Sequence, residues 1–318
     1  MSQISVTRLM DTYKDKNFGS RLKRDLKRNW SLYILALPMV AFFLVFHYAP
    51  LYGLLIAFKD FSPALGIMGS PWVGFDNFLT FFNSRSFTNV VRNTFMLNFY
   101  ALIFTMPASI IFALLLNEIR TSGLKRSIQT LSYLPFFVSL VVVCGMILEF
   151  TGRNGIINDV VYFFTGDRIQ FMLDPGWFRT VYTVSDIWQL LGWGAIIYIA
   201  AIAGLDQELY EAATIDGAGR WRKMRYITLP GILSIIVIIY ILRIGQMLSL
   251  GFEKIILLYN PMIYETADVI SSFMFRVGLM QMEFSYSAAV GMFNSMINFS
   301  LLLIANQVSR RLLGSSLW

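Results

Sequence analysis

Six long apolar runs dominate this 318-residue chain and restrict its fold more than any other feature. Each holds roughly 20 or more mostly apolar residues, the length that a helix needs to cross a bilayer core about 30 Å thick. They are too long for membrane β-strands and lack the alternation that such strands show. We therefore predict an all-α integral membrane protein, with a transmembrane domain over residues 31–308 and six helices at about 31–58, 94–116, 131–150, 181–205, 232–252 and 286–308.

The few charged residues indicate an orientation. Only 14% of residues are charged and 56% are hydrophobic, which excludes a water-soluble surface over most of the chain. With the N-terminus inside, most of the 26 basic residues but fewer than half of the 19 acidic residues fall in inner segments. This distribution is the positive-inside bias of membrane proteins, so the net charge of +7 does not indicate nucleic-acid binding. Both termini are expected to be cytoplasmic.

The ends of the chain are predicted to be a basic N-terminal segment, residues 1–30, and a short tail, residues 309–318. Leu22, Leu26 and Trp30 recur every four residues among Lys and Arg, which suits a short helix on the inner leaflet. A disordered basic tail is the alternative interpretation. No apolar stretch precedes Trp30, so no cleaved signal peptide is expected.

The chain contains one cysteine, Cys144, and one histidine, His47. A single cysteine allows no disulfide and no thiolate cluster within the chain. A zinc site at His47 would need further ligands that the apolar runs do not supply. We expect Cys144 to be a core residue and His47 to be structural, and we expect no metal site.

The polar stretch from 205 to 230 has the pattern of a helix, a turn and a second helix. Asp206 is a good N-cap, Glu208 lies in the first turn, and Gly217 or Gly219 can adopt a left-handed C-cap. Small side chains let a helix approach a partner closely, while large apolar side chains anchor the contact. The small pair is Ala212 and Ala213, and the anchors are Tyr210, Ile215 and Trp221. The loop is therefore predicted to dock a cytoplasmic partner.

The same loop resembles the signature of the permeases of binding-protein-dependent ATP-binding-cassette importers. That signature reads E-A-A, three residues, G, nine residues, I, any residue, L-P, and it is complete here as Glu211-Ala212-Ala213, Gly217, Ile227 and Leu229-Pro230. The resemblance implies a type I importer permease fold and a coupling helix that sits in a cleft of a separate ATPase. The residues that it implies in ATPase coupling are Glu208, Tyr210, Glu211, Ala212, Ala213, Asp216, Gly217, Arg220 and Trp221.

The resemblance covers nearly the whole chain and points to the carbohydrate-uptake branch of the family, including alginate-type importers. The stretches that carry it are 52–60, 69–74, 114–118, 132–135 and 185–188. It implies a second, unlike six-helix permease, two ATPase copies that bind ATP and magnesium, and an extracellular or periplasmic solute-binding protein. This chain itself is expected to bind no cofactor and to lie in the bacterial cytoplasmic membrane. Its expected function is to pass an oligosaccharide or polysaccharide from the binding protein into the cytoplasm.

Polar side chains inside the apolar runs are candidates for a sugar path. Ionisable groups at the bilayer centre cost about 2.5–3.5 kcal/mol, so they usually face the bundle interior or a watery path. Sugars are bound by planar hydrogen-bonding groups and aromatic rings. The alternative role for these side chains is to hold helices together, and Asp186 is a possible partner for Arg243. The candidates are Asp186, Gln189 and Trp193, then Arg243 and Gln246, then Asn294 and Asn298 on a stripe with Ser287 and Gly291.

Two other classes of function remain open. A polytopic membrane enzyme acting on lipid-linked sugars would need a nucleophile, an acid–base pair or a metal site, and no such cluster is evident. An ion-coupled carrier or passive channel would leave the docking loop unexplained. The chain has no G-x-x-x-x-G-K-[ST] loop, so we expect ATP hydrolysis to take place on partner subunits.

Overall fold

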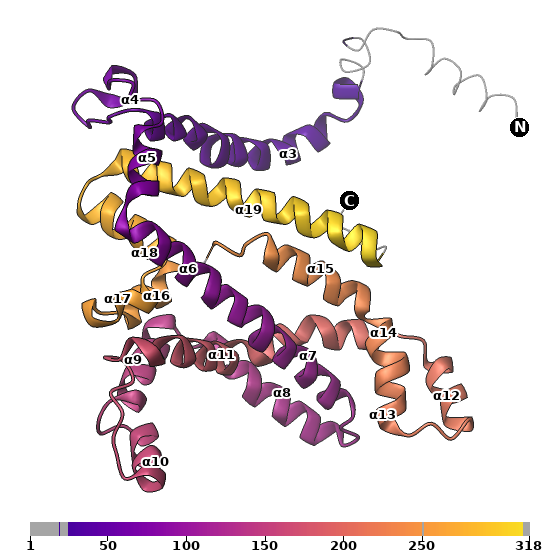
Figure 1. Ribbon diagram of the computed structural model, residues 1–318. Helices are drawn as coiled ribbons and strands as arrows, with labels where there is room; N and C mark the ends of the chain where they lie inside the picture. The colour runs from indigo at the N-terminus through magenta and orange to yellow at the C-terminus, as the bar shows by residue number, and fades with distance from the viewer. Residues whose placement is uncertain (1–18, 20–24, 250, 314–318) are drawn as a thin grey trace, which may run out of the picture. The chain divides into compact units, whose positions relative to one another are not determined.

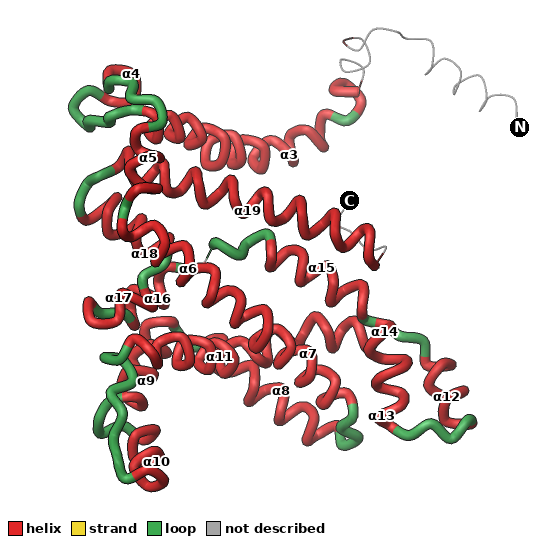
Figure 2. Tube along the Cα trace, in the orientation of Figure 1, coloured by secondary structure: helices red, strands yellow, loops and turns green. Residues whose placement is uncertain are grey.

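The computed structural model describes residue 19 and residues 25–249 and 251–313. Most of the predicted N-terminal segment 1–30, and residues 314–318 of the predicted tail 309–318, lie outside the described residues. Within the described part, the regular elements are helices, and one isolated bridge joins Lys59 to Trp72 (Figure 2). The chain divides into two compact units, Met1–Leu55 and Ile56–Trp318.

The first unit contains most of the first predicted span. It consists of α3 (Trp30–Phe43) and the π-helical turn η1 (Leu44–Tyr48), and the 3-10 helix η2 (Ala49–Phe58) continues from it into the second unit. Together they form a continuous apolar stretch over Trp30–Phe58 with a mean hydropathy of 2.0. The predicted span at 31–58 is therefore confirmed as a helical segment long enough to cross a bilayer.

The second unit begins with two short helices and a long span. The short helices are α4 (Gly66–Gly69) and α5 (Asp76–Asn83). The second span is longer than predicted, because α6 (Arg85–Tyr100), η3 (Ala101–Thr105) and α7 (Met106–Asn117) run on as one 33-residue apolar helix.

The third predicted span, 131–150, is wrong as a single helix. The structure divides it into α8 (Ser122–Phe137) and α9 (Leu140–Thr151), followed by α10 (Ile156–Thr165). Val138 and Ser139 between them are extended, and the Ser139 hydroxyl accepts a hydrogen bond from the Val142 amide as the cap of α9. A new N-cap needs an extended residue, so a serine cap inside an apolar run ends one helix and starts another.

The fourth span is α11 (Pro175–Ala203), an unbroken 29-residue helix capped by Asp174. It packs against α7 and α8, and Figure 1 shows these helices side by side. α12 (Gln207–Ile215) follows after three residues. α11 thus links the bundle directly to the stretch that carries the sequence signature.

The fifth span is bent and shorter than predicted. The elements α13 (Arg220–Lys223), η4 (Met224–Thr228) and α14 (Leu229–Gly231) precede α15 (Leu233–Ile244), with a bend of 56° between the two parts. Pro230 lies at the bend, where it cannot donate a helical hydrogen bond. α15 ends at Ile244 and not at 252, so the end of the predicted fifth helix is corrected.

Residues 252–283, which we call the return segment, form a chain of short helices between α15 and the last span. They are α16 (Phe252–Leu258), η5 (Pro261–Ile263), α17 (Tyr264–Ala267), α18 (Ile270–Phe275) and η6 (Arg276–Met280). The last span is α19 (Phe284–Leu313). The described residues thus hold five apolar spans, or six when the bent pair is counted.

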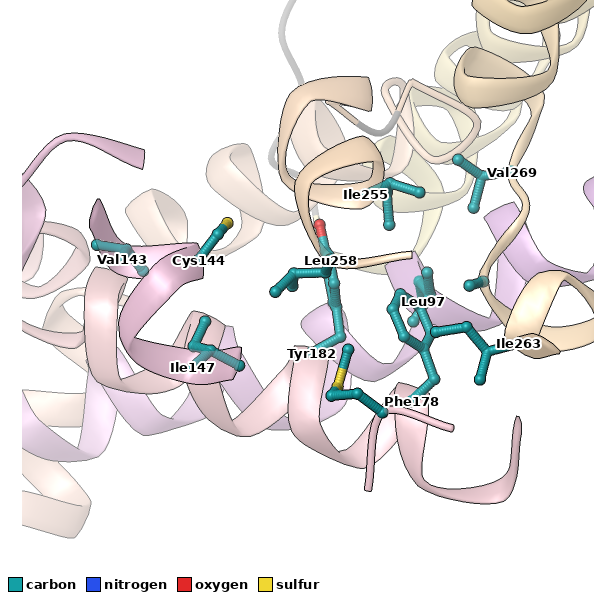
Figure 3. Close-up of a cluster of buried hydrophobic side chains, with 12 residues drawn as sticks. Leu97, Val143, Cys144, Ile147, Phe178, Tyr182, Ile255, Leu258, Ile263 and Val269 are labelled. Atoms are coloured by element: carbon teal, nitrogen blue, oxygen red, sulfur yellow. The ribbon is translucent and has the colours of Figure 1, made fainter. Parts of the chain in front are cut away.

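The return segment contributes to a buried apolar core instead of lying free outside the bundle. Figure 3 shows Cys144 and Ile147 of α9, Tyr182 of α11, and Ile255 and Leu258 of α16 in one cluster. Cys144 is therefore a core residue, as predicted. Burial of this kind stabilises by about 1.5–3 kcal/mol for each large apolar side chain in water, and in lipid it acts mainly through close packing.

Candidate functional site

The signature stretch 205–230, which we call the motif loop, has the predicted helix–turn–helix form. The Asp206 carboxylate accepts a hydrogen bond of 2.9 Å from the Glu208 amide and caps α12. Gly217 has a φ of +73°, so it supplies the left-handed turn that follows the helix. Gly219 is extended, with a φ of −69°, and caps α13 instead. The sequence offered Gly217 and Gly219 as candidates for the left-handed C-cap, and the structure uses Gly217.

Side-chain hydrogen bonds connect the two arms of the motif loop. The Tyr210 hydroxyl lies 2.8 Å from the Thr228 hydroxyl, and the Lys223 ammonium donates to the Thr214 hydroxyl at 2.5 Å. Tyr210 is half-buried, and its hydroxyl contact joins the two arms of the loop; its predicted role in docking stays a prediction.

The opposite surface of the motif loop is exposed and apolar. Ile215 is 88% exposed, Trp221 is 71% exposed and Tyr226 is 70% exposed. Of the nine predicted coupling residues, two are half-buried, Tyr210 and Ala213, and the remaining seven are exposed. Large apolar side chains that are exposed together on one surface are typical of a protein–protein contact.

A second candidate site is a cavity of about 410 Å³ between η3–α7, α11 and α15. It brings together three of the seven predicted path residues, namely Trp193, Arg243 and Gln246. The Trp193 ring stacks on Phe136 with 4.1 Å between ring centroids. An aromatic ring, an amide and a guanidinium around one cavity are groups that can bind a sugar.

Arg243 is the charged group of this cavity. Within the described part of the chain, no acidic side chain lies within ion-pair distance of Arg243. A guanidinium is always charged and presents a planar fork of donors that matches a carboxylate. An unpaired arginine at membrane depth is costly, so it indicates a place where an anion or water is bound.

Asp186 does not partner Arg243, which corrects the sequence-based suggestion. Its carboxylate accepts a hydrogen bond of 2.5 Å from the Lys254 ammonium, and both residues are buried. Lys254 also lies 4.8 Å from the centre of the Tyr182 ring. Lys254 lies just beyond the predicted fifth helix, 232–252, and its burial depends on tertiary packing that no local pattern reveals.

The polar stripe on α19 is used mainly between elements. Asn298 accepts from the Leu248 amide and donates to the Ser249 hydroxyl, both at 2.7 Å. Ser287 donates to the Met274 carbonyl at 3.1 Å. The Asn294 side-chain oxygen is buried without a hydrogen-bond partner among the described residues. Among Ser287, Asn294 and Asn298, only Asn294 has a buried side-chain atom without a partner in the described part of the chain.

Gln189, one turn of α11 away from Asp186, is buried and lies outside the cavity lining. Asp186, Gln189, Asn294 and Asn298 are therefore not brought together with Arg243 at that cavity. A role for these four residues in a transport path stays a prediction.

Comparison with known proteins places the chain among membrane transport components. Residues 105–314 match the family described as "Binding-protein-dependent transport system inner membrane component". The chain is 43% identical to the polygalacturonan/rhamnogalacturonan transport system permease protein YteP of Bacillus subtilis (strain 168) over 297 residues. This alignment covers 93% of this chain and 92% of the relative.

Two solved structures are similar to this chain. One is a bacterial ABC transporter involved in the import of the acidic polysaccharide alginate, with a TM-score of 0.86, 41% identity, and coverage of 92% of this chain and 99% of that chain. The other is a bacterial alginate ABC transporter in complex with a periplasmic protein bound to an alginate pentasaccharide, with a TM-score of 0.86, 40% identity, and coverage of 93% and 100%. With the family match over more than half of its length, the chain belongs to the inner membrane components of binding-protein-dependent transport systems.

Proposed function

We propose that this permease of a sugar importer carries an acidic oligosaccharide into the cytoplasm and is driven by a separate ATPase that docks on the motif loop. The observation that supports it most is the exposed apolar surface of the motif loop, with Ile215 88% and Trp221 71% exposed beside the complete signature. A transport chain that presents such a surface and has no phosphate-binding loop of its own needs an outside source of energy.

The substrate class is proposed from the cavity and from the relatives together. Arg243 lines the cavity with Trp193 and Gln246 and has no acidic partner among the described residues. The printed names of the relatives concern polygalacturonan/rhamnogalacturonan and alginate. Polygalacturonan and alginate are rich in uronic acids, so each sugar ring can offer a carboxylate to a guanidinium.

The proposed assembly follows the family. We infer a second, unlike permease, two copies of an ATPase that bind ATP and magnesium, and a solute-binding protein outside the membrane. The chain is proposed to lie in the bacterial inner membrane with both termini in the cytoplasm, because this orientation gives the positive-inside distribution and places the motif loop beside the ATPase.

A purification experiment tests the docking. The complex is expressed with a tagged permease chain, and the amount of ATPase that co-purifies is measured for the wild type, Ile215→Asp and Leu124→Asp. Leu124 is also an exposed apolar residue, and it lies near the start of α8, away from the motif loop in sequence. We expect Ile215→Asp to lose most of the ATPase and Leu124→Asp to keep it. If wild-type membranes yield no ATPase with the chain, the proposal is wrong.

A further inference from the structure

The buried ion pair between Asp186 and Lys254 connects two parts of the molecule that are far apart in sequence. Asp186 lies in α11, and Lys254 lies near the start of α16 in the return segment. The side chains of Lys254 and Asp186 are 7% and 12% exposed, respectively, and the ammonium also faces the Tyr182 ring at 4.8 Å. The pair thus lies beside Tyr182, which belongs to the apolar cluster of Figure 3, and both charges are largely buried.

α11 is mechanically connected to the motif loop. It runs without a break from Pro175 to Ala203, and three residues separate it from α12, which begins at Gln207. Asp186 lies about 25 Å along the helix from Ala203, at the usual rise per residue. A force applied to α12 therefore reaches Asp186 through the short turn at 204–206 and then along the continuous helix α11 (Figure 1).

The return segment is attached to α11 at further points beyond the ion pair. Thr266 donates to the Pro175 carbonyl at 2.7 Å, and Asn260 donates to the Met172 carbonyl, just before α11, at 2.7 Å. These two bonds lie at the beginning of the helix. The ion pair lies about three helical turns further along it, where both side chains are buried and each charge is costly to separate from its partner.

We propose that the Asp186–Lys254 pair is a positioning link that makes the return segment move with α11 when the motif loop is displaced. Separating the pair would leave two largely buried charges unpaired, so the two elements are held together through the transport cycle. Asp186 and Lys254 act on transport through the elements they join and not by touching the sugar. The inference rests on the proposed function, because it takes the motif loop as the point where force enters.

A second ion pair in the return segment provides a matched control. Arg276 contacts Asp268 at 2.5 Å, and both residues belong to the return segment. This pair has the same chemistry and a similar contact distance, but it does not involve α11. Removing it tests the loss of a charge pair in the return segment without loss of the link to α11.

The experiment uses the assembled complex in proteoliposomes, with its solute-binding protein and alginate pentasaccharide or oligogalacturonate as probes. The readout is the ratio of ATPase activity with the loaded binding protein to the activity without it. The double variant Asp186→Asn with Lys254→Gln removes both charges, so it leaves no unpaired charge in the core. The control double variant is Asp268→Asn with Arg276→Gln, and Lys254→Arg tests rescue by a conservative change.

We expect the Asp186/Lys254 double variant to lower the stimulation ratio by about tenfold, a typical size for coupling between two sites. The control double variant and Lys254→Arg should keep most of the ratio. An unchanged ratio in the first variant, an equal fall in both double variants, or failure of the first variant to assemble would each overturn the inference. A wild-type complex without bound ATPase would instead overturn the proposed function, so the two failures are distinguishable.

Discussion

The motif loop and the return segment lie before and after α15 in the chain and use comparable lengths of chain in opposite ways. The motif loop keeps its large apolar side chains exposed, as at Ile215 and Trp221. The return segment instead buries Ile255 and Ile263, together with the charge of Lys254. The first is built to contact another molecule and the second to complete the core of this one. The difference shows that a polar segment between spans is not necessarily an exposed loop.

The largest contrast between the two regions is expected when a lysine of each is changed to methionine. Lys254→Met leaves the Asp186 carboxylate buried without its partner, which we expect to cost about 3–5 kcal/mol. Lys223→Met in the motif loop removes an exposed hydrogen bond to Thr214 and should change stability by no more than about 0.5 kcal/mol. Thermal unfolding of the detergent-purified chain measures both. Equal shifts in Tm would remove the distinction between the regions.

A smaller effect, on transport and not on stability, is expected at the cavity. Arg243→Met should reduce uptake of an acidic oligosaccharide by about tenfold to a hundredfold, the range for losing a hydrogen bond to a charged group. Uptake of labelled oligogalacturonate by vesicles is the measurement. Arg126→Met is the control, because Arg126 is an exposed arginine of α8 that does not line the cavity. Uptake that stays normal in Arg243→Met would mean that the cavity does not bind the acidic sugar.

The smallest effect is expected at the turn of the motif loop, where two neighbouring glycines differ in conformation. Gly217→Ala forces a side chain into a left-handed conformation at a cost of about 1 kcal/mol, so ATPase binding should weaken several-fold. Gly219→Ala should have no effect, because its φ is −69° and no atom lies within 4 Å of the added carbon. Titration of the ATPase onto the purified permease chains compares them. Equal weakening by both would show that glycine matters here for another reason.

The sequence was sufficient to predict the features that depend on local pattern. Long apolar runs predicted the helical membrane spans, and the signature at Glu211 to Pro230 predicted the transport family, which the family match confirms. The cap at Asp206 and the left-handed turn at Gly217 also agree with the structure. Each of these features is determined by residues within one turn or one short segment.

Features that depend on packing were not predictable from the sequence. The break at Ser139 was missed because its flanking residues are apolar, and the end of α15 was missed because the apolar run continues past Ile244. The partner of Asp186 was missed because Lys254 is 68 positions away along the chain. A charge in a predicted loop can return to the core, and only the tertiary structure shows which charge it meets.

The most direct test of docking at the motif loop is to label position 215 from each side of the membrane. Cys144 is the only native cysteine and is 1% exposed, so an Ile215→Cys variant offers one accessible thiol. A membrane-impermeant maleimide should label it in inside-out vesicles that lack the ATPase, and added ATPase should block the labelling. Labelling from the outer side, or labelling that the ATPase does not change, would contradict an ATPase-driven permease coupled through this loop.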